Sequence, residues 1–302
     1  MRAIVTGGAG FIGSHLVEAL LARGDEVHVV DDLSNGKREN VAPQATLHEH
    51  DVREPLDAIA AEIAPEAILH LAAQADVRVS VREPARDAAV NVVGTVNVLE
   101  AARAHDARVV FASTGGAIYG ECTRPAREDD PRLPLSPYGT AKLAGEEYLA
   151  MFSRLYGAQH VSLRFANVYG PRQDPHGEAG VVAIFLGRMR DGTACQVFGD
   201  GGQTRDYVYV GDVVRAVIGA LGSPTGGVFN VGTGIETSVL ELHELCRAVA
   251  GVEAAPVLAP AREGELGRSF LDVSLTEREL GVTPETPLTA GLAATWAHIL
   301  AD

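Results

Sequence analysis

Four glycines near the start of the chain have the spacing of a phosphate-binding turn. Gly7, Gly8, Gly10 and Gly13 follow the short apolar run 3–5 and open a stretch whose apolar residues lie on one helical face. Glycines between a strand and a helix permit a tight turn and the close approach of a pyrophosphate, whose charge the helix N-terminus stabilises. This pattern predicts a dinucleotide site.

Acidic residues after the next strand-like run indicate which dinucleotide is bound. Asp31 and Asp32 end the apolar run 27–30, about 20 residues beyond the glycines. A carboxylate there accepts hydrogen bonds from the adenosine ribose hydroxyls and repels a 2′-phosphate, which favours NAD over NADP. Asp51 could lie beside the adenine, or it could be a solvated loop acid.

Tyr138 and Lys142 are four residues apart, so a helix places both side chains on one face. A free phenol titrates near pH 10 and is a poor base at neutral pH. A nearby ammonium and a bound nicotinamide cation would lower its pKa. Lys142 is one of only two lysines, with Lys37, among 25 basic residues, which indicates that a lysine is specifically needed there. The pair predicts an acid–base group beside the cofactor.

The segments that carry these residues alternate between strand and helix patterns. Continuous apolar strands between helices predict a parallel sheet covered on both faces. We expect a Rossmann-type doubly wound sheet with a smaller, discontinuous α/β C-terminal lobe. The NAD-binding domain is predicted over residues 1–165, with 206–222 packing back on it, and the second lobe over 166–205 and 223–302. Strands are expected at 3–5, 27–30, 67–71 and 108–112, and helices at 84–105, 137–156, 181–190 and 213–221.

Composition excludes several classes of protein. The chain has 302 residues and a formal net charge of −15, which repels nucleic acid. Its three cysteines are far apart, which argues against a disulfide framework or a zinc cluster, and we expect no metal. No apolar run approaches the roughly 20 residues of a membrane helix. We therefore expect a soluble, cytoplasmic protein with no membrane partner.

With these motifs, the sequence resembles the extended short-chain dehydrogenase/reductase family and, within it, the UDP-glucose 4-epimerases. The resemblance covers essentially the whole chain. It is carried by the glycine turn, residues 31–36, the segment 91–95, Tyr138 with Lys142, and the C-terminal segments 164–172, 199–206 and 262–265.

The resemblance implies a bound NAD and a second lobe that clamps a nucleotide-diphosphate sugar. The implied cofactor-binding residues are Gly7, Gly10, Phe11, Ile12, Gly13, Asp31, Asp32, Asn35, Asp51, Val52, Leu71, Ala72, Ala73, Asn91, Tyr138 and Lys142. The implied substrate-binding residues are Ser113, Thr114, Asn167, Arg205, Arg262 and Ser269. Convergent arginines agree with this, because an acidic protein needs them to hold a diphosphate.

The segment before Tyr119 departs from the family pattern. The family usually has Ser or Thr four residues before this tyrosine, where the chain has Gly115. The hydroxyls fall earlier, at Ser113 and Thr114, and we expect Thr114 to share the substrate hydroxyl's proton unless water does so. The related 4,6-dehydratases carry an Asp-Glu pair after the Thr, whereas this chain has Gly116 and Ala117.

The implied reaction inverts C4 of a UDP-hexose through a transient 4-keto sugar, with Tyr138 and Lys142 as catalytic residues. In the family a large aromatic at the position of Ser269 excludes an N-acetyl group, so the small serine predicts that N-acetylated sugars are accepted as well. Arg268 or Arg78 could instead favour a uronic acid, as in a UDP-glucuronate 4-epimerase or decarboxylase. A non-catalytic NAD-binding scaffold and a net reductase are further alternatives. Family members often pair through the two helices at 84–105 and 137–156, so we expect a homodimer.

Overall fold

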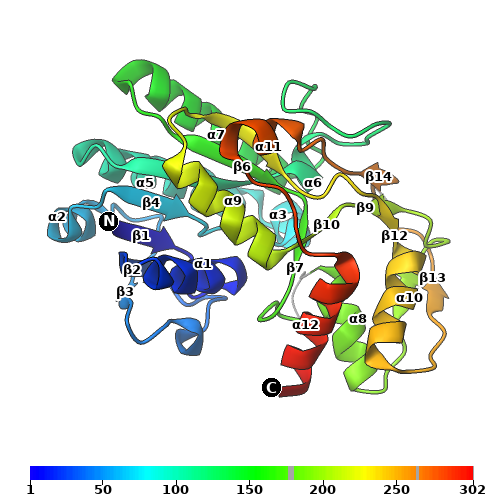
Figure 1. Cartoon of the computed structure of the whole chain (residues 1–302). Coiled ribbons are helices and arrows are strands. Elements are labelled where there is room, and N and C mark those ends of the chain that lie inside the picture. Colours follow the sequence, from blue (N-terminus) through cyan, green and yellow to red (C-terminus); the bar gives the residue numbers. More distant parts are fainter. Residues whose placement is uncertain (176–179, 263–264, 302) are drawn as a thin grey trace.

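Seven parallel strands form the central sheet of the computed structural model, which describes residues 1–175, 180–262 and 265–301 (Figure 1). Their order is β11-β6-β5-β4-β1-β2-β3. The sequence therefore predicted the fold class correctly. The chain grows outward from β1 on one side and from β4 on the other, so the loops after these two strands diverge and leave a crevice suited to a ligand. The strands are β1 (Arg2–Thr6), β2 (Glu26–Asp31), β3 (Thr46–Glu49), β4 (Ala67–His70), β5 (Arg108–Thr114), β6 (Val161–Phe165) and β11 (Gly227–Val231).

Helices cover both faces of the sheet because successive strand residues point to opposite sides. Val5 packs in a cluster with Leu16 of α1 (Phe11–Ala22) and Val213 of α9 (Val210–Gly222). Ile4, the residue before Val5, packs in a second cluster with Leu99 and Leu149. This second layer contains α2 (Asp57–Ile63), α5 (Gly94–Ala104) and α7 (Pro137–Tyr156). The two layers explain why the strands are apolar without alternation.

The long helix predicted over 84–105 is continuous but changes its winding. It comprises α4 (Pro84–Ala88), a π-helical turn at Ala89–Val93, and α5. A short helix, α3 (Val77–Arg82), precedes it. π-Helical turns occur frequently at functional sites, and this one holds Asn91.

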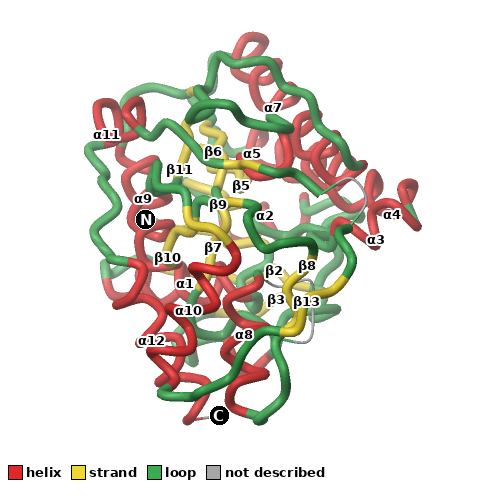
Figure 2. Tube along the Cα trace, turned by 90° about the vertical axis from the view of Figure 1, so that its right-hand side faces the viewer, coloured by secondary structure: helices red, strands yellow, loops and turns green. Residues whose placement is uncertain are grey.

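The C-terminal lobe lies at one end of the molecule, where α8, α10 and α12 pack against one another (Figure 2). Its helices are α8 (Val181–Arg190), α10 (Val239–Ala250) and α12 (Leu288–Ala301). Its strands are β8 (Gln196–Phe198) with β13 (Val257–Ala259), and β9 (Thr204–Arg205) with β12 (Thr237–Ser238) and β14 (Arg268–Ser269). Shorter elements are β7 (Asn167–Tyr169) with β10 (Tyr207–Tyr209), α6 (Gly115–Ile118), α11 (Ser274–Leu280) and the 3-10 turn Arg38–Asn40.

One strand crosses the predicted domain boundary. Residues 223–302 were assigned to the second lobe, yet β11 pairs with β6 at the edge of the central sheet. The short run 227–231 extends the sheet because its residues Phe229 and Val231 join the core beneath α9. In contrast, α9 lies against α1, so residues 210–222 pack on the NAD-binding half.

Within the described residues, no helix combines the length and apolarity needed to cross a membrane. The three cysteines, Cys122, Cys195 and Cys246, are buried free thiols. No group of three or more potential metal ligands occurs in the part of the chain that the structure describes.

Candidate active site

The glycine turn connects β1 to α1 and has no room for side chains. Gly7 has φ +70°, and a Cβ there would lie 2.7 Å from the Ala72 nitrogen. A Cβ on Gly13 would lie 2.1 Å from the Gly7 carbonyl oxygen. Gly10 precedes α1 without a side-chain cap, and the first turn carries no acid. Free amides at this helix start are suited to an anion such as a pyrophosphate.

The two acids at the end of β2 have different surroundings. Asp31 is buried, and its carboxylate accepts hydrogen bonds from the amides of Ala9 (3.0 Å) and Leu33 (2.9 Å). Desolvation raises the pKa of Asp31. Asp32 is exposed and accepts from the amide (2.9 Å) and hydroxyl (2.6 Å) of Ser34. Asp31 thus braces the glycine turn, while Asp32, with exposed Asn35 nearby, has oxygen surface open to a ribose.

Residues after β3 and β4 complete the predicted cofactor surface. Asp51 pairs with Arg53, and that hydrogen bond lowers the pKa of Asp51. Val52 is buried beneath α5, where its carbonyl accepts from Asn97 (2.9 Å). Asn91 is buried and clamps the strand-end loop, because its amide exchanges two hydrogen bonds with the Gln74 backbone. The predicted residues that remain half-exposed around the crevice are Gly7, Gly10, Phe11, Ile12, Leu71, Ala72 and Ala73.

Tyr138 and Lys142 lie on α7, as the sequence predicts. Ser136 caps the helix by accepting from the Gly139 amide (3.1 Å), and Pro137 begins it. The Lys142 Nζ is 6.0 Å from the Tyr138 ring centroid and donates to the Ala112 carbonyl (2.8 Å). The ammonium therefore lies between Tyr138 and the C-terminal part of β5.

Burial shifts the pKa of both groups toward their neutral forms. Desolvation raises the pKa of Tyr138 to about 12, and the charge of Asp87 adds to this. Desolvation lowers the pKa of Lys142 to about 8, although Asp87 and Glu146 act in the opposite direction. The chain alone thus holds a protonated phenol, and positive charge in addition to that of Lys142 is needed to generate phenolate near neutral pH.

The two hydroxyls at the end of β5 point to different environments. Ser113 is buried and donates to Glu146 Oε1 (2.6 Å), so its hydroxyl belongs to the core beneath α7. Thr114 precedes α6 with a side chain that does not cap the helix. A Cβ on Gly116 would lie 4.0 Å from Thr114 Oγ1 and 3.6 Å from Asn167 Oδ1. Of the two predicted hydroxyls, Thr114 is the one that faces the space around Gly116, which Asn167 also borders.

Packing explains why position 115 is occupied by glycine. A Cβ at this position would lie 2.6 Å from the side chain of Leu271, which is buried. A serine or threonine would therefore collide with Leu271 unless that side chain moved, and the preceding residue, Thr114, carries the hydroxyl at the end of β5.

Strand pairing brings the substrate-lobe residues together. Arg205 of β9 lies opposite Ser269 of β14 in a parallel register. The Asp206 amide donates to the Ser269 carbonyl (3.1 Å), and the Asn167 amide donates to the Asp206 carbonyl (2.9 Å). Asn167, Arg205 and Ser269 therefore share one patch, although they come from three separate segments of the chain.

Arg262 forms a second part of this patch. Its guanidinium carbon is 3.8 Å from the centroid of the Phe198 ring, a cation–π contact. Arg205 is 3.7 Å from the carboxylate of Glu265, whose amide donates to the Arg262 carbonyl (3.4 Å). Two guanidinium groups and an aromatic ring offer surfaces for a diphosphate and a base. Glu263 and Gly264 of the predicted motif lie outside the described residues.

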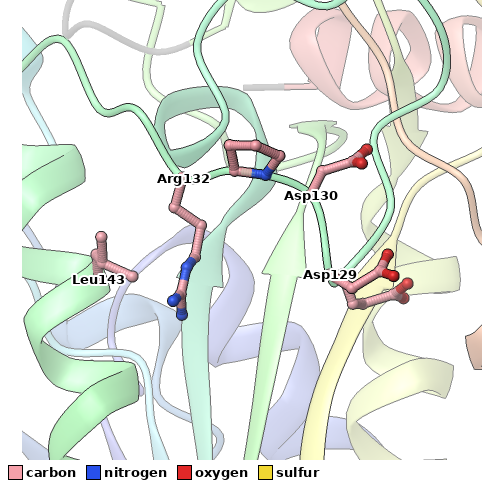
Figure 3. Close-up of a pocket in the computed structure, with 6 residues that line it drawn as sticks. Asp129, Asp130, Arg132 and Leu143 are labelled. Carbon is pink, nitrogen blue, oxygen red and sulfur yellow. The ribbon is translucent and has the colours of Figure 1, made fainter.

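A separate hollow lies beside α7. It has a volume of about 440 Å³ and is lined by residues 128–132 and Leu143 (Figure 3). Three of its lining residues, Glu128, Asp129 and Asp130, are acidic, and Arg132 is paired with Glu147 (2.9 Å). An acidic lining is unsuited to a diphosphate, and none of the predicted site residues lines it.

Two buried acids near Tyr138 and Lys142 were missed by the sequence analysis, as was Phe198. Asp87 and Glu146 lie on the helices predicted at 84–105 and 137–156, but periodicity alone does not say that an acidic residue is buried. A signal was available for Glu146, which is four residues after Lys142 on the same helical face. Phe198 ends the short run 196–198 before a glycine-rich turn, and nothing in its spacing indicates a contact with Arg262.

The residues present fit NAD. The glycine turn excludes side chains where a pyrophosphate would approach, and an exposed acid follows β2, where a ribose would lie. The basic group Lys142 and the phenol Tyr138, both on α7, lie beside the C-terminal part of β5, on the side of the sheet where its strands end.

Comparison with known proteins agrees with this geometry. The profile of the NAD dependent epimerase/dehydratase family matches residues 3–232. A UDP-glucose 4-epimerase of Mycolicibacterium smegmatis is 49% identical over 305 residues, which cover 98% of this chain and 97% of that protein. A crystal structure of a Thermotoga maritima UDP-glucose 4-epimerase with UDP-glucose has a TM-score of 0.98 at 46% identity and covers 100% of this chain and 99% of its own. The Thermus thermophilus UDP-glucose 4-epimerase in complex with NAD has a TM-score of 0.94 at 46% identity, with 99% of each chain covered.

Proposed function

The chain belongs to the NAD dependent epimerase/dehydratase family, and from this premise we propose that it is a UDP-glucose 4-epimerase with tightly bound NAD. The proposal rests on one observation. A dinucleotide turn, a Tyr–Lys pair and a patch with two arginines all lie on the side of the molecule where the carboxyl ends of the sheet strands lie. The high identity to UDP-glucose 4-epimerases over nearly the full length supports it.

The proposed mechanism assigns a task to each group of residues. Bound NAD supplies a hydride acceptor and donor at C4 of the sugar. Tyr138, as phenolate, takes the proton of the 4-hydroxyl, and Thr114 hydrogen-bonds the same oxygen. Lys142 stabilises the phenolate by its charge. Arg205 and Arg262 hold the diphosphate while the sugar presents its other face, which places the reacting carbon without fixing the ring.

We propose that the sugar subsite also accepts N-acetylated UDP-hexoses. Ser269 supports this, since it presents only a small side chain opposite Arg205. For a uronic acid the sequence offered Arg268 and Arg78 as partners. Arg268 is already paired with Glu236 (2.6 Å), and Arg78 lies 3.6 Å from Asp76. These pairs favour a neutral sugar over a UDP-glucuronate 4-epimerase or decarboxylase.

The proposal includes a cytoplasmic homodimer. The three buried free thiols support a reducing compartment. Exposed Tyr148 and Leu155 on α7 support pairing through this helix.

The test is epimerisation of UDP-galactose by purified protein without added NAD. We expect UDP-glucose to form, and UDP-N-acetylgalactosamine to react as well, whereas UDP-galacturonate should not. Activity that appears only when NAD is added would still support the epimerase reaction, but it would refute the tight binding of NAD. Absence of conversion in both cases, with NAD binding intact, would favour a non-catalytic scaffold. Tyr138→Phe is the matched control, because it should bind NAD yet lose at least about a hundredfold in kcat.

A further inference from the structure

Asp87 is a fully buried acid that the proposed mechanism does not use. It lies on α4, which packs against α7, and its side chain is 1% exposed. One carboxylate oxygen, Oδ1, accepts from Gln74 Nε2 (2.9 Å) and from Asn91 Nδ2 (3.0 Å). The other, Oδ2, is buried without a hydrogen-bond partner among the described residues. A buried oxygen with no donor is costly, so its retention calls for an explanation.

The hydrogen-bonded oxygen fixes the loop after β4. Asn91 exchanges two hydrogen bonds with the Gln74 backbone (3.0 and 2.9 Å), and Gln74 also donates to the Asp76 carbonyl (2.9 Å). Asp87 orients both amides by accepting from each. It therefore sets the path of residues 71–76, which include the predicted cofactor residues Leu71, Ala72 and Ala73.

The second oxygen belongs to a carboxylate whose charge acts on the Tyr–Lys pair. Two buried carboxylates, Asp87 and Glu146, raise the pKa of Lys142, and Asp87 also raises that of Tyr138. Glu146 is neutralised by Arg164 in a bidentate pair of 2.9 and 2.7 Å. Asp87 has no such cation among the described residues. Of the two buried carboxylates that act on Lys142, Asp87 is therefore the one whose charge is not compensated by a paired cation among the described residues.

The other charged groups around α4 do not take this role. Arg78 and Arg82 on α3 and Arg86 on α4 are exposed, and Arg86 pairs with Glu83 (3.2 Å). His70 at the end of β4 is buried, and desolvation lowers its pKa to about 3, so it is neutral near pH 7.

We propose that Asp87 is a positioning residue, the buried counter-ion that keeps the Lys142 ammonium charged beside Tyr138 while its hydrogen bonds hold the cofactor loop 71–76 in place. One carboxylate thus couples the loop after β4 to the acid–base pair on α7. The inference deepens the proposed epimerase function and rests on it for its catalytic meaning, but the electrostatic coupling can be measured without any substrate.

The chain offers a direct test because Lys142 and Lys37 are its only lysines. Protein labelled with lysine carrying ¹³C at Cε gives two lysine signals, and Lys37→Arg identifies the one from Lys142. The chemical shift of each is followed against pH in the protein as purified. In Asp87→Asn, which keeps the acceptor toward Gln74 and Asn91, we expect the Lys142 pKa to fall by on the order of one unit. Asp87→Glu keeps the negative charge, so the Lys142 pKa should return most of the way to its wild-type value. Lys37, which is exposed, is the internal reference.

The pH profile of kcat with UDP-galactose gives the second readout. Loss of the Asp87 charge lowers the pKa of both Tyr138 and Lys142, so both limbs of the profile should move to lower pH. Glu62→Gln, an exposed change of equal charge on α2, should move neither limb. A lower kcat at every pH with unmoved limbs and an unmoved Lys142 titration would overturn the proposal.

Two further outcomes are separable. If Asp87→Asn does not fold, Asp87→Ser, smaller and neutral, is titrated instead, and an unchanged Lys142 pKa there would also overturn the proposal. If the wild type has no epimerase activity but Lys142 shifts as expected, the counter-ion role stands and the proposed function fails.

Discussion

Two adjacent residues, Ser113 and Thr114, offer hydroxyls at the end of β5, and their surroundings predict opposite effects of substitution. Thr114→Val removes the hydroxyl that faces Gly116, and we expect kcat to fall at least about tenfold with little change in stability. Ser113→Ala removes a donor to buried Glu146 (2.6 Å) and should cost about 1–2 kcal/mol of unfolding free energy, with kcat nearly unchanged. Steady-state kinetics with UDP-galactose and urea denaturation measure both. An unchanged kcat in Thr114→Val would remove Thr114 from the mechanism.

Burial of the Lys142 ammonium should lower the free energy of unfolding of the protein. The pKa of Lys142 falls from 10.5 to about 8 on burial, so the folded chain binds fewer protons between these values. The penalty for burying the ammonium is therefore fully present below pH 8 and disappears as the pH rises toward 10.5. The difference corresponds to about 3 kcal/mol, partly offset by the hydrogen bond to the Ala112 carbonyl (2.8 Å).

We accordingly expect Lys142→Met to be inactive yet more stable at pH 7 than the wild type, by about 1–2 kcal/mol. The gain should vanish by pH 10. Urea denaturation at both pH values measures it, and Lys37→Met, at an exposed position, is the matched control. A variant less stable than the wild type at pH 7 would contradict this account of burial.

Motif residues were predictable from the sequence, but their individual partners were not. The Tyr138–Lys142 spacing and the glycines follow from local geometry, which spacing determines. The inward turn of Asp31 toward the Ala9 amide and the pairing of Ser113 with Glu146 depend on contacts between distant segments. For the same reason the sequence did not predict a role for Asp87, since nothing in the neighbouring sequence shows that this residue faces α7.

At the scale of elements, the contact between the glycine turn and α1 should tolerate no added carbon. Gly13→Ala would place its Cβ 2.1 Å from the Gly7 carbonyl oxygen and push the start of α1 away from the turn. We expect NAD to be lost on gel filtration, with activity restored only partly by added NAD. Gly222→Ala, where no atom lies within 4 Å of the added Cβ, should retain it. Full retention of NAD in Gly13→Ala would show that the turn does not approach the cofactor closely.

Element patterns were predicted best where they are long. The helices at 137–156 and 181–190 have the expected bounds because each has many apolar residues at one period. The five-residue strand β11 was assigned to the second lobe, since so short a run does not reveal which sheet it joins. The π-helical turn at Ala89–Val93 could not be predicted either, because it changes the helical winding without interrupting the apolar pattern.

At the scale of the whole molecule, a net charge of −15 must coexist with an anionic substrate. The long-range field repels a nucleotide sugar, so we expect affinity to depend on the proposed local patch with Arg205 and Arg262. Screening by salt weakens the repulsion between exposed charges more than these close contacts. The topology makes the patch possible, because β9 and β14 bring positions 205 and 269 into register.

The exposed face of α7 leads to the last prediction, which concerns assembly. Tyr148 and Leu155 are 38% and 64% exposed, and Arg103 of α5 lies over the Tyr156 ring (5.2 Å). These exposed apolar side chains on α7 are suited to contact a second copy of the chain. We expect a dimer of twice 31.7 kDa by light scattering at micromolar concentration. Leu155→Arg should give a monomer by placing a charge in that interface. Leu300→Arg on α12, equally exposed at 60% but outside this face, should remain dimeric. A wild-type monomer, or a Leu155→Arg variant that still dimerises, would exclude α7 as the dimer interface.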